Sequence, residues 1–391
     1  MTFEQIKALE NASHMPTYGR YPVALESGHG TIIKDVAGKE YLDFGSGIGV
    51  SALGQTDDDW VAAVQAQTAK LAHISNLYYN ETQALFTSEL CAATGLAAAF
   101  LSNSGAEANE CAIKLARKYS YDTYGENRST IISLKQSFHG RTMATLSATG
   151  QDALHTHFMP FIPGFSFVEA DDTAALKAAV SEDVCAILVE SVQGEGGVIP
   201  LDEAYLGAIR AICDEKDILL IVDEIQTGVG RTGSFLACTG MGVTPDIVTM
   251  AKGLGGGLPI GACLCNEKLA HVMSAGMHGS TFGGNPIICA GARVVLEKVN
   301  TPAFLEEVTK KGAYLQQKLE ELQGISEVRG KGLMVGLVLS EKEAPAVVNA
   351  CLEKGLLVLT AKTLLRLLPP LTVSYAEIDA AVAILAEVLA A

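Results

Sequence analysis

The chain has 391 residues, of which 49% are hydrophobic and 18% are charged, so it can bury a large core and is not expected to be disordered. Its 28 basic and 44 acidic residues give a formal net charge of −16, which disfavours binding to nucleic acids or to anionic membrane surfaces. No apolar stretch approaches the roughly 18 residues that a membrane span needs, and residues 1–14 lack the pattern of a secretory signal. The nine cysteines have no paired spacing, which indicates free thiols and predicts a cytoplasmic protein without a zinc site.

Short apolar segments alternate with longer segments of helical periodicity, which is typical of an α/β fold with a mainly parallel sheet. In chain order we expect a strand at 99–101, a helix at 106–124, strands at 130–134 and 185–189 with a helix at 174–180 between them, a helix at 203–215, strands at 218–222, 247–250 and 261–265, and a helix at 268–275. Beyond residue 285 we expect helices at 286–299 and 302–322, an extended segment at 328–339 with a turn at Gly330 and Gly332, a helix at 344–354 and a last helix from Ala376. The sequence therefore predicts a large central α/β domain and a smaller α+β domain to which the N-terminal segment returns.

Two charged residues stand just beyond predicted buried strands. Asp223 follows the apolar strand at 218–222, which places its carboxylate at the edge of the sheet where α/β proteins bind ligands. Lys252 follows the strand at 247–250 among glycines, where burial would lower the pKa of its amine and allow it to form a Schiff base. Alone, Asp223 fits a carboxylate that caps a loop and Lys252 fits a surface lysine. Together they are the pair that pyridoxal phosphate needs, an imine-forming amine and a carboxylate that keeps the pyridine nitrogen protonated.

A phosphate site is expected where the strand at 99–101 leads through Ser102-Asn-Ser-Gly-Ala-Glu107 into a helix. Backbone N–H groups at a helix start, together with a serine hydroxyl, bind phosphate well. Ser104 also fits an ordinary helix N-cap paired with Glu107. The two interpretations are compatible, because a phosphate can share these donors.

These motifs resemble those of the class III, or subgroup II, pyridoxal-phosphate aminotransferases of fold type I. The resemblance covers essentially the whole chain and is carried, in the family's order, by Phe138-His-Gly-Arg141, Glu190-Ser-Val-Gln-Gly-Glu195-Gly-Gly, Asp223 to Gly233 followed by Lys252, and Ser280-Thr-Phe-Gly-Gly-Asn-Pro286. It implies a homodimer with shared active sites. It also implies a large domain over residues 51–290 with a mainly parallel seven-stranded sheet flanked by helices, a small α+β domain over residues 291–391, and residues 1–50 packed with the small domain.

The resemblance implies roles for the cofactor site. Lys252 would bind the cofactor covalently and then move the proton between substrate and cofactor, Asp223 would pair with the pyridinium nitrogen, and Gln226 would hydrogen-bond the phenolic oxygen. Phe138 would stack on the ring, although without the motif it fits a core phenylalanine equally well. The residues implied at the phosphate are Ser104, Gly105, Ala106 and, reaching across from the neighbouring subunit, Thr281.

The substrate side is implied in the same way. Arg366 would bind the α-carboxylate of 2-oxoglutarate, and Glu195 would pair with that arginine while the terminal amine of the donor is bound. Arg141 would hold the distal carboxylate of 2-oxoglutarate and the α-carboxylate of the donor. Taken alone, Arg366 fits an edge strand and Arg141 a surface position at a helix start. Tyr18 and Ser280 would complete the substrate contacts.

The segments Tyr18–Val23 and Ser75–Asn80 and the compact length resemble family members that act on N2-acetyl-L-ornithine. The implied reaction with 2-oxoglutarate gives N-acetyl-L-glutamate 5-semialdehyde and L-glutamate in arginine biosynthesis. The alternative donors within the family are ornithine, succinylornithine, succinyl-diaminopimelate and 4-aminobutyrate. Ile48 stands where ornithine δ-aminotransferases have tyrosine, which disfavours free ornithine, and Ser191 replaces the proline that usually follows Glu190.

Two other classes of protein are weaker alternatives. A nucleotide-binding dehydrogenase is disfavoured because Gly253–Gly257 does not form the G-x-G-x-x-G motif after a first strand. A non-catalytic binding protein of the same fold is disfavoured by the presence of both Lys252 and Asp223. The histidines show no spacing typical of a metal site.

Overall fold

The central element of the fold is a seven-stranded sheet in the order β4-β12-β11-β10-β7-β5-β6, in a computed structural model that describes residues 1–391. The strands are β4 (Ala98–Ser102), β5 (Thr130–Leu134), β6 (Phe165–Val168), β7 (Val184–Glu190), β10 (Leu219–Asp223), β11 (Ile247–Met250) and β12 (Gly261–Cys265). Only β12 runs antiparallel to its neighbours. Every residue of β7, β10, β11 and β12 is buried, which explains why these strands form continuous apolar runs in the sequence.

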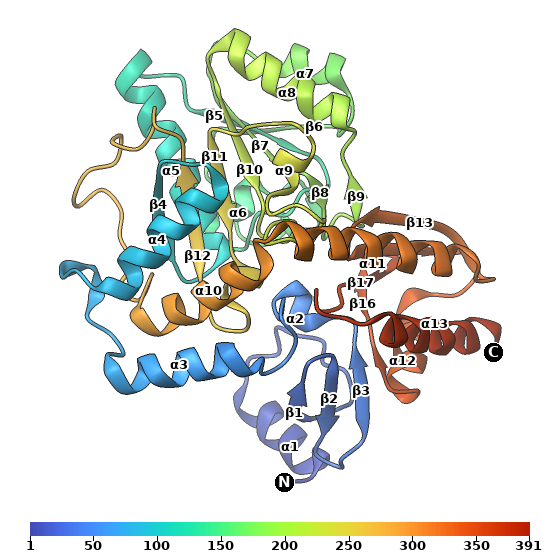
Figure 1. Ribbon diagram of the computed structural model, residues 1–391. Coiled ribbons are helices and arrows are strands. Elements are labelled where there is room, and N and C mark those ends of the chain that lie inside the picture. Colours follow the sequence, from blue (N-terminus) through green and yellow to red (C-terminus); the bar gives the residue numbers. More distant parts are fainter.

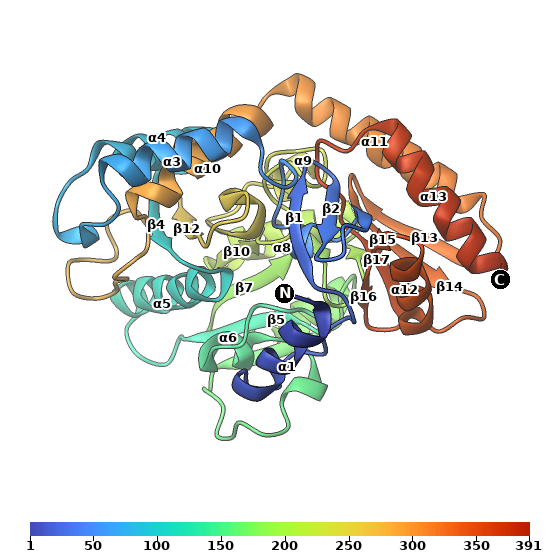
Figure 2. The same cartoon turned by 90° about the horizontal axis from the view of Figure 1, so that it is seen from below.

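Helices cover the sheet, as Figure 1 shows. Helix α5 (Gly105–Tyr124) packs against β11 and β12, and α8 (Glu203–Lys216) packs against β7, β10 and α7 (Thr173–Ala179). Helices α3 (Asp58–Lys70), α4 (Glu81–Thr94) and α10 (Pro286–Val299) lie side by side in both Figure 1 and Figure 2. The predicted α/β class with a mainly parallel seven-stranded sheet is therefore confirmed.

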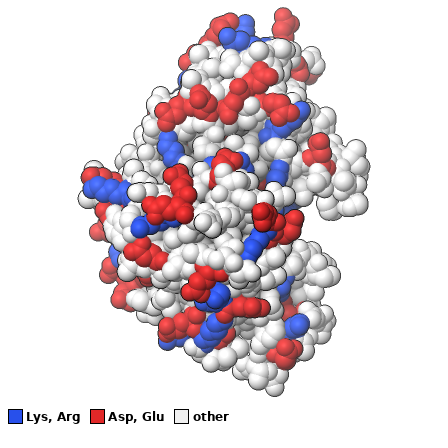
Figure 3. All heavy atoms as spheres, turned by 90° about the vertical axis from the view of Figure 1, so that its right-hand side faces the viewer, with Lys and Arg blue, Asp and Glu red and all other residues white.

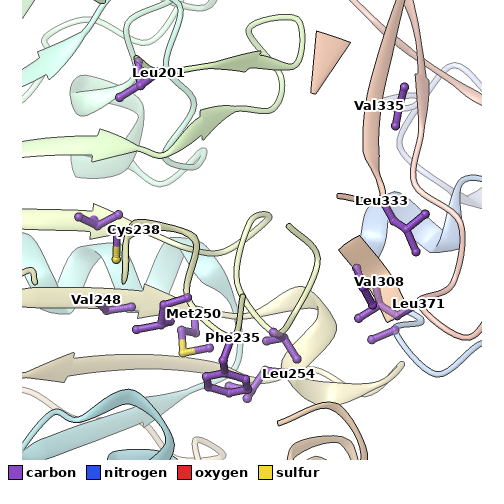
Figure 4. Close-up of a cluster of buried hydrophobic side chains, with 14 of the residues drawn as sticks. Leu201, Phe235, Cys238, Val248, Met250, Leu254, Val308, Leu333, Val335 and Leu371 are labelled. Carbon is purple, nitrogen blue, oxygen red and sulfur yellow. The ribbon is translucent and has the colours of Figure 1, made fainter. Parts of the chain in front are cut away.

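The C-terminal part forms a second, antiparallel sheet in the order β13-β14-β17-β16. Its strands are β13 (Ile325–Lys331), β14 (Met334–Leu339), β16 (Leu359–Ala361) and β17 (Leu364–Leu367). The helices of this part are α11 (Pro302–Glu320), α12 (Ala344–Glu353) and α13 (Tyr375–Ala390), which lie on the right of Figure 1. One cluster of buried apolar residues joins both parts. It runs from Val248 and Met250 on β11 to Val308, Leu333 and Leu371 (Figure 4).

The N-terminal segment does not form a separate unit. After α1 (Phe3–Ser13), the strands β1 (Leu25–His29), β2 (Ile32–Asp35) and β3 (Glu40–Asp43) form a sheet whose last strand is β15 (Leu356–Leu357). Strand β3 pairs with β15 in parallel, with Leu42 opposite Leu356. The N-terminal strands are thus paired with a strand of the C-terminal part. The residue limits of the domains stay a prediction.

The helix predicted at 268–275 is wrong. The backbone bonds there, from Leu269 to Asn266 and from Val272 to Leu269, span three residues and form isolated turns. Leu269 is buried and produced the apolar spacing on which the prediction depended.

The surface agrees with the charge count. On the face shown in Figure 3, acidic and basic side chains are interspersed and no continuous basic area is visible. None of the helices is both long and apolar enough to cross a lipid bilayer. All nine cysteines are free thiols, and only Cys91 is not buried.

Candidate active site

A cavity of about 450 Å³ opens at the carboxyl edge of the seven-stranded sheet. It lies between the end of β10, the segment after β11, the start of α5 and the loop that follows β5. Among the residues around it are Ser104, Gly105, Ala106, Phe138, Arg141, Glu190, Asp223, Gln226 and Lys252. The structure therefore brings most of the predicted site residues to one place, although they come from distant segments of the chain.

Asp223 is held in a fixed orientation at one end of this cavity. Its Oδ2 accepts a hydrogen bond from Asn109 Nδ2 at 2.8 Å and lies 2.8 Å from His139 Nδ1. Because an ionised carboxylate only accepts, that histidine nitrogen carries the proton. Its Oδ1 accepts from the backbone N–H of Ile225 at 3.0 Å. A carboxylate offers about four acceptor positions, so Asp223 can still accept from a donor in the cavity.

Asn109 is itself fixed from the neighbouring strand. It lies on α5, and its Oδ1 accepts from the hydroxyl of Thr249 on β11 at 2.7 Å. Its amide also donates to the carbonyl of His139 at 2.8 Å. None of the three supports Asn109, His139 and Thr249 was among the predicted site residues. His139 lies inside the Phe138-to-Arg141 motif and could have been found there, whereas the other two carry no signal in their spacing.

Lys252 follows β11 and opens the short helix η3 (Lys252–Gly255). Its φ of +44° lies in the left-handed region, which residues other than glycine adopt only where the surrounding structure enforces it. Burial lowers the pKa of the Lys252 amine, against the opposing effect of the negative charges of Asp223 and Glu195. A lowered pKa increases the fraction of the neutral amine, which is the nucleophilic form.

The opposite end of the cavity is formed by the start of α5. Ser104 is the N-cap, and its hydroxyl accepts from the backbone N–H of Glu107 at 3.2 Å. The N–H groups of Gly105 and Ala106 belong to the first helical turn, which has no carbonyl partners within the helix. Such a helix start attracts an anion through its free donors and its dipole.

The loop that carries Phe138 lies close to this helix start because residue 140 is glycine. Gly140 has a φ of +138°, and a Cβ on it would lie 2.9 Å from the Cβ of Ala106 and 2.5 Å from Oγ1 of Thr145. Any side chain at this position would push the loop away from α5. Arg141, which follows, is exposed at the cavity, with its guanidinium 5.9 Å from the centre of the Phe138 ring.

An ion pair lies beside the cavity on the side of the C-terminal sheet. Nη1 of Arg366, a residue of β17 that is only 3% exposed, donates to Glu195 Oε1 at 2.6 Å and to Gln226 Oε1 at 3.2 Å. Glu195 stands on the loop between β8 (Val192–Gln193) and β9 (Ile199–Pro200). Both charges are close enough to act on the amine of Lys252.

Comparison with known proteins identifies the family. The chain matches the family Aminotransferase class-III over residues 14–389. It belongs to the class III aminotransferases. The acetylornithine aminotransferase of Haemophilus ducreyi is 51% identical over 391 residues, which are 100% of this chain and 99% of that protein. The acetylornithine aminotransferase of Caldanaerobacter subterraneus subsp. tengcongensis is 48% identical over 380 residues, or 96% of each chain.

Solved structures of the family have the same fold. The ornithine aminotransferase of Toxoplasma gondii superposes with a TM-score of 0.96 at 31% identity, over 100% of this chain and 95% of that chain. The N-acetylornithine aminotransferase of Stenotrophomonas maltophilia gives a TM-score of 0.85 at 36% identity, over 98% of both chains. A second structure of the T. gondii enzyme shows partial occupancy of pyridoxal phosphate at its active site. The expected family, fold type and enzyme class are confirmed, and the chain is a pyridoxal-phosphate-dependent aminotransferase.

The residues around the cavity fit pyridoxal phosphate. The anion-binding start of α5 suits the phosphate, and the remaining acceptor position of Asp223 suits a protonated ring nitrogen. The Lys252 amine, with its pKa lowered by burial, suits covalent attachment. Phe138 lines the same cavity and offers an apolar ring face.

Two buried glutamates support this site without a predicted role. Glu190 at the end of β7 accepts from the backbone N–H groups of Phe138 at 3.0 Å and Gly194 at 3.2 Å, so it ties the Phe138 loop to the Glu195 loop. Burial raises the pKa of Glu190, and the nearby charge of Asp223 adds to this.

Ser191, the departure from the usual proline, donates its hydroxyl to Glu224 Oε1 at 3.3 Å. The serine is thus one of three donors to the fully buried Glu224 carboxylate, beside the hydroxyl of Thr227 and the backbone N–H of Cys238.

Five predicted residues do not line the cavity: Glu195 and Arg366, which pair beside it, and Ser280, Thr281 and Tyr18. Ser280 and Thr281 line a separate groove of about 1220 Å³, together with Ser75, Leu77 and Tyr79. Ser280 is nevertheless linked to the phosphate end, because its Oγ accepts from Asn103 Nδ2 at 3.0 Å. Tyr18 is 71% exposed and lies against Arg20. Their roles stay predictions.

Proposed function

We propose that the chain transfers the terminal amino group of N2-acetyl-L-ornithine to 2-oxoglutarate, giving N-acetyl-L-glutamate 5-semialdehyde and L-glutamate. The observation that carries the proposal is the Arg366–Glu195 ion pair beside a cavity that also holds Lys252 and an exposed Arg141. The names and identities of the relatives support the choice of donor. This reaction belongs to arginine biosynthesis.

The charges explain how one cavity accepts two different substrates. The donor carries a carboxylate at one end and an amine at the other, so Arg141 binds the carboxylate and the amine reaches Lys252. Glu195 meanwhile neutralises Arg366, so that no free cation repels the donor amine. The acceptor carries two carboxylates, and its α-carboxylate replaces Glu195 on Arg366 while Arg141 binds the other.

The chain's own residues carry the proton transfer and the orientation. Bound pyridoxal phosphate supplies a carbonyl for amine exchange and a ring that accepts the electron pair left on the substrate carbon. Lys252 would hold the cofactor, and its amine would take the proton from the substrate carbon once the donor is bound. Asp223, fixed by Asn109 and His139, keeps the ring nitrogen protonated. Gln226 lies between the cavity and Arg366, where it can hydrogen-bond the ring oxygen.

We also propose that the active enzyme is a homodimer. The groove that holds Thr281 is flanked by large exposed side chains, with Leu77 85%, Tyr79 104% and Phe282 61% exposed. A second copy of the chain on this face would cover them and bring its Thr281 to the phosphate end of the neighbouring cavity. The free thiols support the further proposal that the enzyme works in the reducing cytoplasm.

The half-reaction of the purified holoenzyme tests the proposed donor. N2-acetyl-L-ornithine, ornithine and 4-aminobutyrate are added separately while the absorbance of the cofactor is followed. We expect N2-acetyl-L-ornithine to convert the cofactor fastest and 2-oxoglutarate to restore it. A faster reaction with another amine would overturn the donor but leave the roles of Lys252 and Asp223 intact.

Sedimentation of the wild type and of Leu77→Asp tests the dimer. We expect the wild type to sediment as a dimer, and the variant, with a buried charge at the interface, to dissociate and lose activity. Thr281→Ala is expected to keep the dimer and to bind the cofactor more weakly. A wild-type monomer with full activity would contradict the proposal.

A further inference from the structure

Three residues form a row across the small C-terminal sheet. Arg329 on β13 lies opposite Gly336 on β14, and Gly336 lies opposite Arg366 on β17. Residues that face each other in an antiparallel sheet project from the same side. The two arginines therefore flank a position without a side chain. The proposed function uses Arg366 and gives Arg329 no role.

The position between the arginines is filled from the β8–β9 loop. A Cβ on Gly336 would lie 2.8 Å from the Cβ of Val198, so only glycine leaves room for that valine. Val198 is fully buried and has a φ of +52°, which a β-branched residue rarely adopts. Such a backbone persists only where its surroundings hold it. The packing of Val198 against Gly336 helps to hold this backbone conformation.

Both arginines bind the loop that contains Val198. Arg366 Nη1 donates to the Glu195 carboxylate at 2.6 Å, and Arg329 Nε donates to the carbonyl of Gly197 at 2.9 Å. A ligand carboxylate can replace the side chain of Glu195 on Arg366. The bond to Gly197 is made to the backbone, and it does not have to break when that side chain leaves.

We propose that Arg329 is a positioning residue that holds the β8–β9 loop on the C-terminal sheet, so that Glu195 is placed to pair with Arg366. This inference rests on the proposed function. Ordering a loop costs conformational entropy, and the Arg329–Gly197 bond offsets that cost before the ion pair forms. Without Arg329, the Glu195–Arg366 ion pair must itself offset the entropy cost of ordering the loop, so this pair becomes weaker. Arg366 then binds a ligand carboxylate more readily. Its positive charge is also less fully neutralised by Glu195, so it repels the donor amine more strongly.

The test compares the two half-reactions of the Arg329→Met holoenzyme. Methionine keeps the apolar stem and removes the donor. We expect kcat/KM for N2-acetyl-L-ornithine to fall about fivefold and that for 2-oxoglutarate to change less than about twofold. The Kd of glutarate, an unreactive dicarboxylate, is measured by calorimetry and is expected to fall about fivefold. A residue that only stabilises the fold would weaken both half-reactions alike and would not tighten glutarate binding.

Three further variants control the experiment. Arg329→Lys keeps a donor for the Gly197 carbonyl and should restore most of the difference from wild type. Glu327→Gln removes the exposed carboxylate 3.6 Å from Arg329 and should behave as wild type. Gly336→Ala pushes on Val198 and should reproduce the unequal effect on the half-reactions. If Arg329→Met does not fold, the Gly336→Ala variant therefore tests whether the C-terminal sheet positions the β8–β9 loop.

Glu195→Gln separates this inference from the proposed function. If this variant affects the two half-reactions equally, the exchange at Arg366 does not occur and the proposed function fails at that point. If it affects them unequally while Arg329→Met and Gly336→Ala do not, the exchange stands and the role of Arg329 is overturned. An unequal effect in all three variants supports both.

Discussion

The two ends of the active site are built differently, and the end at the sheet is the fixed one. At the sheet, Asp223 is bound by Asn109, His139 and the backbone N–H of Ile225, so its position does not depend on any substrate. At the other end, the Arg366–Glu195 pair links the C-terminal sheet to the β8–β9 loop through a side-chain contact that a ligand carboxylate can replace. The group whose position stays the same for every substrate, Asp223, thus lies at the end of a strand. The ion pair that must open for one substrate and close for the other lies between the C-terminal sheet and a loop next to the large sheet.

Removing Lys252 tests the fixed end most severely. Lys252→Ala removes both the amine that holds the cofactor and the group that moves the proton, so we expect kcat to fall by about 10⁴-fold or more. Single-turnover measurements with N2-acetyl-L-ornithine and the absorbance of the cofactor check this. Lys354→Ala, at an exposed pair with Glu387, is the control and should keep full activity. Substantial activity in Lys252→Ala would show that Lys252 is not the catalytic residue.

Asp223→Asn keeps the size of the side chain at the fixed end and removes its charge. Asparagine cannot keep the ring nitrogen protonated, so we expect kcat to fall by about 10²- to 10³-fold while the protein still folds. Thr249→Val, which removes only the hydroxyl that binds Asn109, should have a much smaller effect. Steady-state kinetics of the three proteins check the order. Equal losses in both variants would mean that hydrogen bonding rather than charge matters at this position.

The two ends also differ in how far the sequence predicts them. The apolar strands at 130–134, 247–250 and 261–265 have the predicted bounds, because a fully buried strand leaves a continuous apolar run between turns. The residues that follow such strands, Asp223 and Lys252, could therefore be placed at the sheet edge. Their supports could not, because the contact of Asn109 with Thr249 joins positions 140 residues apart that no local pattern connects.

Elsewhere the prediction failed where local signals are weak. Strand β6 has a short Phe165-Ser-Phe-Val168 run with only one buried residue, and it was not predicted. The N-terminal strands were not predicted individually, because they are short and rich in polar residues and their sheet is completed by β15, which is more than 300 residues away in the chain. The row of Arg329, Gly336 and Arg366 depends on the register of three strands, which the sequence does not contain in a local form.

Arg141 lines the cavity and should matter for both substrates. Arg141→Met removes a charged donor from the cavity mouth, so we expect the KM of both N2-acetyl-L-ornithine and 2-oxoglutarate to rise about 10- to 100-fold, with a smaller change in kcat. The equal effect on two substrates distinguishes Arg141 from Glu195, whose replacement should affect them unequally. Steady-state kinetics with each substrate varied in turn check this. A rise confined to one substrate would assign Arg141 to one half-reaction only.

The smallest effect concerns stability and follows from the burial of Lys252. Burial lowers the pKa of this amine in the folded protein below its ordinary value of 10.5, so over the interval between the two values the unfolded chain binds a proton that the folded chain does not. The free energy of unfolding of the cofactor-free protein should therefore rise with pH across that interval. Lys252→Met removes this dependence, so the variant should be more stable than the wild type at pH 7.

The difference between the two proteins should shrink as the pH rises toward and past 10.5, because only above that value is the lysine neutral in both states. Urea unfolding at equal protein concentration, over a series of pH values, measures it. Lys354→Met, at an exposed position, should follow the wild type throughout. A difference that does not change with pH would mean that methionine stabilises the site by packing alone. Burial of the Lys252 amine would then carry no pH-dependent cost.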